Sequence, residues 1–174
     1  QYLTGSERMQ KRPIKALVDA LIEIGANIEY ENEEGYPPLI IHSPSQEIKN
    51  EVNIRSNISS QYISALLMMA PTLPQGLKLN LEGEIVSLPY LKMTLAILSE
   101  FGIEYVFENN SILIKPQPYQ SKDYFVESDW SAASYYYSMA AIAEEAEIVL
   151  KGLNKNSIQG DAKMAEIAEQ FGIK

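Results

Sequence analysis

One pattern, written three times, constrains this chain more than any other feature of its sequence. Each copy is an amphipathic stretch that ends at a glycine and then returns to β-type residues. The copies occupy residues 13–30, 89–105 and 161–174. Apolar residues at helical spacing predict a helix in each copy, and in the first two a proline suits the first helical position. The pattern predicts three equivalent helices that end at Gly25, Gly102 and Gly172, where a left-handed cap favours glycine.

A second repeated element lies between these helices. Residues 54–61 run into the apolar stretch YISALLMMA, and residues 126–133 run into SYYYSMAAIA. Both predict a strand, then a cap at Asn57 or Asp129, then a helix. A β-rich run from Leu77 and a hairpin that turns at 109–110 complete a unit with the order βαβαββ.

The spacing of these elements predicts how the chain is divided. One unit is complete, at about residues 52–115, the second half of such a unit precedes it, and the front of another follows it. Residues 116–123 contain two prolines and no apolar periodicity, which is typical of a linker. We therefore predict an α+β fold with one partial domain at 1–125 and the start of a second domain at 126–174.

Composition limits the chemistry. The 174 residues include no cysteine and one histidine, which excludes thiolate and histidine-cluster metal sites. A net charge of -9 argues against nucleic acid and anionic membranes as partners. Because no leader or spanning segment is recognisable, we expect a cytoplasmic protein, and because the chain opens at Gln1 without a methionine, we expect a piece of a longer one.

The positive charge is concentrated near the start. Of the 14 basic residues, four are Arg8, Lys11, Arg12 and Lys15, just before or at the start of a predicted helix. Guanidinium groups match carboxylates and phosphates, and a helix N-terminus adds partial positive charge. The segment therefore predicts an anion site, and a solvated basic loop is the alternative.

Two further segments carry hydroxyl groups at predicted helix starts. Ser59 and Ser60 precede Gln61, and Ser87 stands two residues before Pro89 and three before Tyr90. Hydroxyls beside free backbone N–H groups suit a phosphate monoester. Helix capping and aromatic packing are the alternative interpretations of these residues.

Five segments together resemble one family. LTGSERMQKRP, GYPPLIIH, NISSQYISALLMMAP, EGEIVSLPYLKMTL and ESDWSAASYYY are similar, in order and spacing, to the 5-enolpyruvylshikimate-3-phosphate synthase family. The resemblance covers almost the whole chain. It implies the enolpyruvyl transferase fold, or inverse alpha-beta prism, in which two domains of three βαβαββ units hold the substrates between them.

The resemblance also implies site residues, matched by motif. Arg8 resembles an arginine that binds phosphoenolpyruvate, and Gln61 resembles a residue between the two substrates. The expected contacts to shikimate 3-phosphate are Ser59, Ser60, Ser87 and Tyr90. Leu88 departs from the Lys or Arg that the family commonly has before this proline.

The implied activity is a transferase step of the shikimate pathway, which leads to chorismate and the aromatic amino acids. It needs no metal and no cofactor, and we expect the full-length enzyme to be monomeric. No proton-transfer group is assigned within the chain, so we predict that the chain alone is catalytically silent. The alternatives are enolpyruvyl transfer to a UDP-amino sugar and a non-catalytic anion-binding repeat domain.

Overall fold

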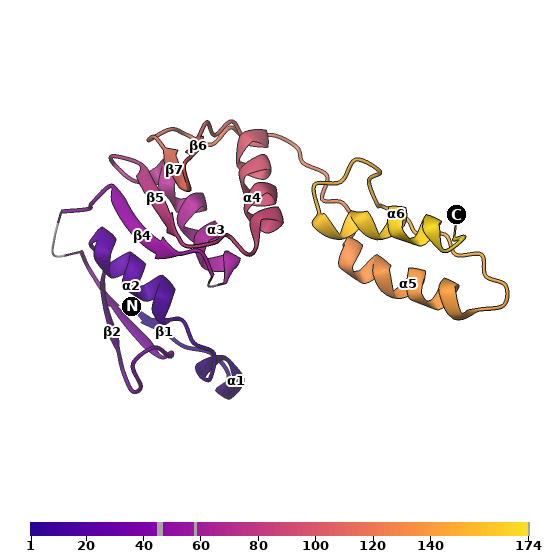
Figure 1. Cartoon of the computed structure of the whole chain (residues 1–174). Helices are drawn as coiled ribbons and strands as arrows, with labels where there is room; N and C mark the ends of the chain where they lie inside the picture. Colours follow the sequence, from indigo (N-terminus) through magenta and orange to yellow (C-terminus); the bar gives the residue numbers. More distant parts are fainter. Residues whose placement is uncertain (45–46, 58, 174) are drawn as a thin grey trace. The chain divides into compact units, whose positions relative to one another are not determined.

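The chain forms two compact units in a computed structural model that describes residues 1–44, 47–57 and 59–173 (Figure 1). Unit 1 is Gln1–Gln120 and unit 2 is Ser121–Lys174. The division falls within the proline-containing stretch 116–123. The assignment of 1–125 and 126–174 to two domains of a larger enzyme stays a prediction.

A four-stranded sheet organises most of unit 1. Its strands are β4 (Glu51–Arg55), β5 (Leu77–Glu82), β6 (Val106–Glu108) and β7 (Ser111–Ile114), in the spatial order β4-β5-β7-β6. Strands β4 and β5 are parallel, and β7 is antiparallel to both of its neighbours. The hairpin turns at Asn109 and Asn110, both at positive φ, which confirms the predicted turn.

The sheet has one apolar face, on which the core of unit 1 is built. Residues alternate along each strand, and the register aligns the buried ones across the sheet. These are Val52, Ile54, Leu77, Leu79, Leu81, Ile112 and Ile114. Helices α2 (Lys15–Ile24), α3 (Ser60–Met69) and α4 (Leu88–Glu100) add apolar side chains to the same core. A short 3-10 helix, Ala70–Thr72, follows α3.

The N-terminal part of unit 1 repeats the second half of this arrangement. Strands β1 (Tyr2–Leu3), β2 (Asn27–Tyr30) and β3 (Leu39–His42) pair in the order β1-β3-β2, with α2 between β1 and β2. The complete unit has the matching order β5-β7-β6, with α4 between β5 and β6. One complete βαβαββ unit preceded by half of another is thus present, as the sequence predicts.

The three predicted helices end in the same way. Gly25, Gly102 and Gly172 all have positive φ. Each glycine N–H donates to the carbonyl three residues earlier, and the next N–H donates to the carbonyl five residues before it, over 2.9 to 3.2 Å. This pair of hydrogen bonds requires a residue in the left-handed conformation, which explains why glycine occupies each position. The predicted helix ends are confirmed.

The predicted helix starts are less accurate. Pro13 is not the first helical residue, because α2 begins at Lys15 after the N–H of Ile14 donates to Gly35 O over 2.8 Å. Asn57 does not cap α3 either. It lies in a turn that directly follows β4, and Ser59 occupies the cap position.

Just before β5 begins, the backbone passes very close to the end of β7. Gly76, at φ +69°, stands so near the end of β7 that an added Cβ would lie 2.2 Å from Ile114 O. No side chain fits there, so the register between β5 and β7 depends on this glycine.

Unit 2 is helical. Helix α5 (Trp130–Ile142) packs against a 3-10 turn (Gly160–Ala162) and α6 (Lys163–Gln170). Asp129 caps α5 by accepting from Ser131 N over 2.8 Å, which confirms that prediction. The prediction of a strand before this cap is wrong. Among the described residues, that segment has one backbone bond to another segment, from Ser128 N to Gly152 O, and a strand needs a ladder of them.

No helix in the described ranges combines the length and the apolar character that crossing a membrane requires.

Candidate functional site

The parallel pair β4–β5 brings two of the predicted segments to one edge of the sheet. Arg55 pairs with Glu82, so both strands end at the same level. Helix α3 begins a few residues after β4, and α4 begins a few residues after β5. Because parallel strands have their carboxyl ends at one edge, the first turns of α3 and α4 start from that edge.

Ser56 connects the two loops at this edge. It is the one buried polar residue recorded among the described residues, with 1% of its surface exposed. Its N–H donates to Glu82 O over 2.9 Å, and its Oγ lies 2.8 Å from both Glu82 O and Glu84 O. The chain leaving β4 is thereby held against the chain leaving β5.

The predicted residues of α3 lie around its N-terminus. Ser59 caps the helix, and its Oγ accepts from Gln61 N over 3.4 Å. Ser60 is the first helical residue and is half-buried, while Gln61 is exposed. The backbone N–H groups of a first turn have no partner within their own helix, so hydroxyl and amide donors gather here.

The predicted residues of α4 lie in the matching place. Ser87 occupies the cap position but makes no capping bond with its side chain, so its hydroxyl is not used by the helix. Pro89 lies in the first turn, as predicted for a proline-initiated helix. Tyr90 follows with 53% of its surface exposed. This tyrosine does not pack into the core.

The basic segment divides into paired and unpaired cations. Lys15 Nζ lies 3.1 Å from Asp19 Oδ1 and 2.6 Å from Glu34 Oε1, and these carboxylates raise its pKa. Arg8, on the short helix α1 (Glu7–Gln10), is exposed, as are Lys11 and Arg12. Within the described parts of the chain, none of these three has an ion pair. Of the four cations in the predicted cluster, Lys15 is therefore paired with carboxylates and the other three are not.

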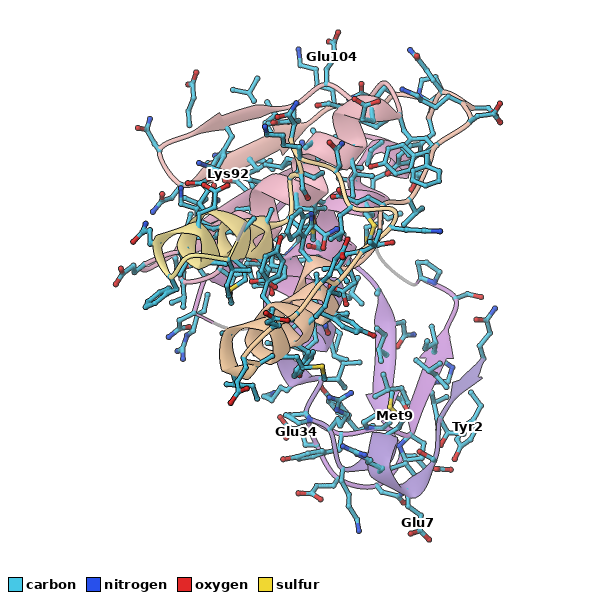
Figure 2. All side chains as sticks on the ribbon, turned by 90° about the vertical axis from the view of Figure 1, so that its right-hand side faces the viewer. Tyr2, Glu7, Met9, Glu34, Lys92 and Glu104 are labelled. Atoms are coloured by element: carbon cyan, nitrogen blue, oxygen red, sulfur yellow. The ribbon has the colours of Figure 1, made fainter. Side chains whose placement is uncertain are left out.

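A tyrosine connects this segment to α3. Tyr62 lies in the first turn of α3, and its hydroxyl donates to Pro13 O over 2.5 Å. The carboxyl end of the basic segment is thereby held beside the turn that carries Ser59 and Ser60. For Arg8 itself, no hydrogen bond to α3 or α4 is recorded among the described residues. Figure 2 shows Glu7, its neighbour in α1, and Glu34 near the same end of unit 1.

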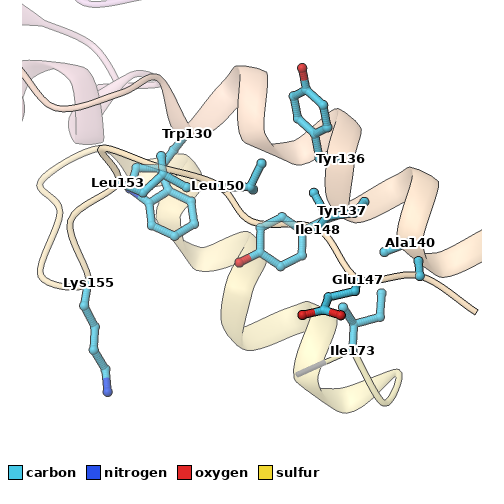
Figure 3. Close-up of a pocket in the computed structure, with 11 residues that line it drawn as sticks. Trp130, Tyr136, Tyr137, Ala140, Glu147, Ile148, Leu150, Leu153, Lys155 and Ile173 are labelled. Atoms are coloured by element: carbon cyan, nitrogen blue, oxygen red, sulfur yellow. The ribbon is translucent and has the colours of Figure 1, made fainter.

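A separate hollow of about 460 Å³ lies in unit 2 and contains none of the predicted site residues. Trp130, Tyr137 and Ile148 line it, with Lys155 at one side (Figure 3). Trp130 is 6% exposed, and its Nε1 has no partner among the described residues. No group of three or more potential metal ligands occurs in the described ranges.

The sequence model of EPSP synthase, described as 3-phosphoshikimate 1-carboxyvinyltransferase, matches residues 1–174. The chain belongs to the EPSP synthase family. The family predicted from the sequence motifs is confirmed.

Curated relatives give the same result. The chain is 50% identical over 172 residues to a 3-phosphoshikimate 1-carboxyvinyltransferase of Bacteroides fragilis, covering 98% of this chain and 42% of the relative. It is 44% identical over 175 residues to that of Haemophilus ducreyi, covering 98% of this chain and 39% of the relative. The chain thus spans about two fifths of the length of these relatives.

A solved structure supports the fold. An EPSP synthase from Acinetobacter baumannii matches with a TM-score of 0.73 at 24% identity, over 98% of this chain and 37% of that one. The predicted enolpyruvyl transferase fold, present in part, is confirmed.

The sequence interpretation missed three side chains that shape this edge of the EPSP synthase fold. Ser56, Tyr62 and Thr94 all bond across elements, to Glu84 O, Pro13 O and Ser64 Oγ respectively. A signal existed for one of them, because Ser56 is a polar residue directly after a β-strand. Nothing in the sequence indicates the partners of Tyr62 and Thr94, which are distant along the chain.

Proposed function

We propose that this chain is the part of an EPSP synthase that holds shikimate 3-phosphate and contacts phosphoenolpyruvate. The enzyme transfers the enolpyruvyl group of phosphoenolpyruvate to the 5-hydroxyl of shikimate 3-phosphate and releases phosphate. The family match supports this substrate pair over a UDP-amino sugar. The observation that carries the proposal is the start of α3 and of α4 from one sheet edge, and it supports the proposal because Ser60, Ser87 and Tyr90 all belong to these two helix starts.

Each group has a chemical task in the proposal. Ser59 and Ser60 bind the phosphate monoester with hydroxyls and with N–H groups of the first turn of α3. Ser87 and Tyr90 supply hydroxyls from α4 to the same ligand. Gln61 lies between the two substrates. Arg8 binds the anionic groups of phosphoenolpyruvate with its guanidinium.

In the reaction, the 5-hydroxyl oxygen forms a bond to C2 of phosphoenolpyruvate, and its proton is lost while C3 gains one. The resulting tetrahedral adduct breaks its bond from C2 to the phosphate oxygen and returns a proton from C3. The chain contributes groups that bind and orient the two substrates. Such orientation can supply a large part of the lowering of the activation free energy in a reaction between two substrates. We assign it no proton-transfer residue, so the purified chain should show no turnover.

We further propose that the enzyme is a cytoplasmic monomer that binds no nucleic acid. The concentration of basic residues in one segment of a chain with net charge -9 supports small anions as ligands.

Calorimetric titration of shikimate 3-phosphate into the 174-residue chain tests the proposal. Binding should be measurable in the wild-type chain and should be abolished in the double variant Ser59→Ala, Ser60→Ala. Ser111→Ala, which removes a hydroxyl bonded to Asn80 Oδ1 on the open face of the sheet, is the matched control and should bind as the wild type does. Equal heats for all three proteins would show the proposal to be wrong.

A chimera tests activity directly. Residues 1–174 replace the aligned segment of the Bacteroides fragilis relative, whose flanks supply the remaining length. The chimera should release phosphate from phosphoenolpyruvate in the presence of shikimate 3-phosphate. An inactive but folded chimera, as judged by circular dichroism, would count against the proposal.

A further inference from the structure

Two half-buried hydroxyls join α3 to α4. Ser64 Oγ lies 2.7 Å from Thr94 Oγ1, and Thr94 Oγ1 lies 3.1 Å from Tyr90 O in its own helix. A threonine hydroxyl has one proton, which Thr94 donates to Tyr90 O, so Ser64 is the donor to Thr94. The result is a chain of two hydrogen bonds from α3 to the backbone of the first turn of α4.

The position of this pair along the helices is specific. Ser64 stands four residues after Ser60, and Thr94 stands four residues after Tyr90. Four residues are about one helical turn, and both helices run from the same sheet edge. The pair therefore lies one turn below the two proposed ligand-binding turns, Ser60 on one side and Tyr90 on the other.

The surroundings of the pair do not require hydroxyls. Ile63, Leu91 and Leu95 are buried close by along the same helices. Where two apolar groups replace both partners of a hydrogen bond, stability is often little changed, so packing alone would be served by Ala and Val. The Ser64–Thr94 contact is a hydrogen bond between side chains of α3 and α4.

We propose that Ser64 and Thr94 are positioning residues that fix the distance between the first turns of α3 and α4, and so the spacing of the hydroxyls that receive shikimate 3-phosphate. This inference rests on the proposed function. Without the bond, the ligand itself must hold the two turns at the right spacing, and that cost appears as weaker binding. Neither residue touches the ligand in this proposal.

The test measures ligand affinity in the chain and Michaelis constants in the chimera. Thr94→Val removes the hydroxyl with almost no change in volume, and Ser64→Ala removes the other. Each should weaken binding of shikimate 3-phosphate by between about 2- and 10-fold, the range that one hydrogen bond spans. In the chimera, the KM for shikimate 3-phosphate should rise by a similar factor, while the KM for phosphoenolpyruvate stays within about 2-fold of the wild-type value.

Two controls separate positioning from stability. Thr94→Ser and Ser64→Thr keep the hydroxyls and should restore affinity. Thr72→Val removes a hydroxyl that donates to Met69 O over 2.7 Å just beyond the far end of α3, and it should leave affinity unchanged. If Ser64→Ala fails to fold, Thr94→Val still removes the same bond.

The outcomes are distinct. Weaker binding by the hydroxyl-free variants with recovery in Thr94→Ser supports the inference. Wild-type affinity in Thr94→Val overturns it and leaves the proposed function intact. Failure of the wild-type chain and of the chimera to bind shikimate 3-phosphate overturns the proposed function and this inference with it.

Discussion

At the scale of single residues, the difference between neighbouring cations is informative. Lys15 has two carboxylate partners, whereas Arg8, Lys11 and Arg12 have none among the described residues. In an acidic chain, cations without a local partner keep their charge available for a ligand. The sequence shows the cluster, but it cannot distinguish the paired member, because Glu34 lies 19 positions away from Lys15.

Arg8→Gln and Lys15→Gln form a matched pair of substitutions with the same change of charge. In the chimera, Arg8→Gln should raise the KM for phosphoenolpyruvate by roughly 10-fold or more, as expected for a lost charged hydrogen bond. Lys15→Gln should change it by less than about 2-fold, because its charge is already balanced. Steady-state kinetics with varied phosphoenolpyruvate measure both. Equal effects of the two substitutions would mean that pairing of a cation with nearby carboxylates does not decide its contribution to phosphoenolpyruvate binding.

The pH response of Glu34 follows from the same pair. The hydrogen bond and charge of Lys15 hold the pKa of Glu34 below its ordinary value of 4.5. A lowered folded-state pKa stabilises the fold at pH values above 4.5, and the effect disappears as the pH falls through the lower value. Lys15→Gln should raise the pKa of Glu34 in an NMR titration. The melting temperatures of variant and wild type should differ at pH 7, and the difference should shrink as the pH falls through the lowered pKa of Glu34. A difference that grows on acidification would contradict this account.

At the scale of elements, features that depend on local sequence were predicted correctly, whereas features that depend on contacts with distant segments were not. The glycine-ended helices and the hairpin at Asn109–Asn110 follow from dihedral preferences that the residues carry themselves. Asn57 does not cap α3, because the helix begins at Ser60 with Ser59 at its cap position, and the neighbouring Ser56 bonds instead to Glu82 O and Glu84 O. The predicted strand before Asp129 failed because a strand depends on a neighbour that no local pattern specifies.

The candidate site divides in the same way. Ser59, Ser60, Ser87 and Tyr90 could be selected from the sequence because residues at helix starts have recognisable chemistry. That their two helices start together depends on the parallel pairing of β4 with β5, which the repeat suggests and only the fold establishes. Their roles toward substrates stay predictions.

Ser56→Ala tests the connection between the ends of β4 and β5. The substitution leaves the carbonyls of Glu82 and Glu84 without the buried hydroxyl, so the free energy of unfolding should fall by about 1–3 kcal/mol. Urea denaturation measures the change. Ser111→Ala, whose partner lies on the open face of the sheet, should cost less than about 1 kcal/mol. An equal loss of stability in both variants would contradict the claim that the buried hydroxyl of Ser56 stabilises the fold more than that of Ser111.

At the scale of the whole molecule, the two units differ in how much core they contain. The cluster of buried apolar side chains lies entirely in unit 1. In unit 2, the buried apolar residues among those described are Trp130, Ala133 and Ala168, while Phe125, Ile142 and Phe171 are 81%, 87% and 77% exposed. Because burial of apolar surface is the main stabilising contribution, unit 1 should be the more stable part.

Limited proteolysis of the 174-residue chain should therefore leave a resistant product that ends near residue 120. Hydrogen exchange should be slow in β5 and β7 and fast throughout α5, because exchange follows local stability. Mass spectrometry measures both the product and the exchange. Equal protection of α5 and β5 would show that unit 2 folds as firmly as unit 1.

A position that accommodates no side chain should be recovered almost only as glycine when its codon is randomised. An added Cβ at Gly76 would lie 2.2 Å from Ile114 O, whereas at Gly83 it would meet nothing nearer than Ser56 Oγ at 3.7 Å, although both residues have positive φ. In a library that randomises both codons under selection for solubility alone, codon 76 should return glycine almost exclusively. Codon 83 should also accept asparagine and aspartate, the residues that enter the left-handed region most readily.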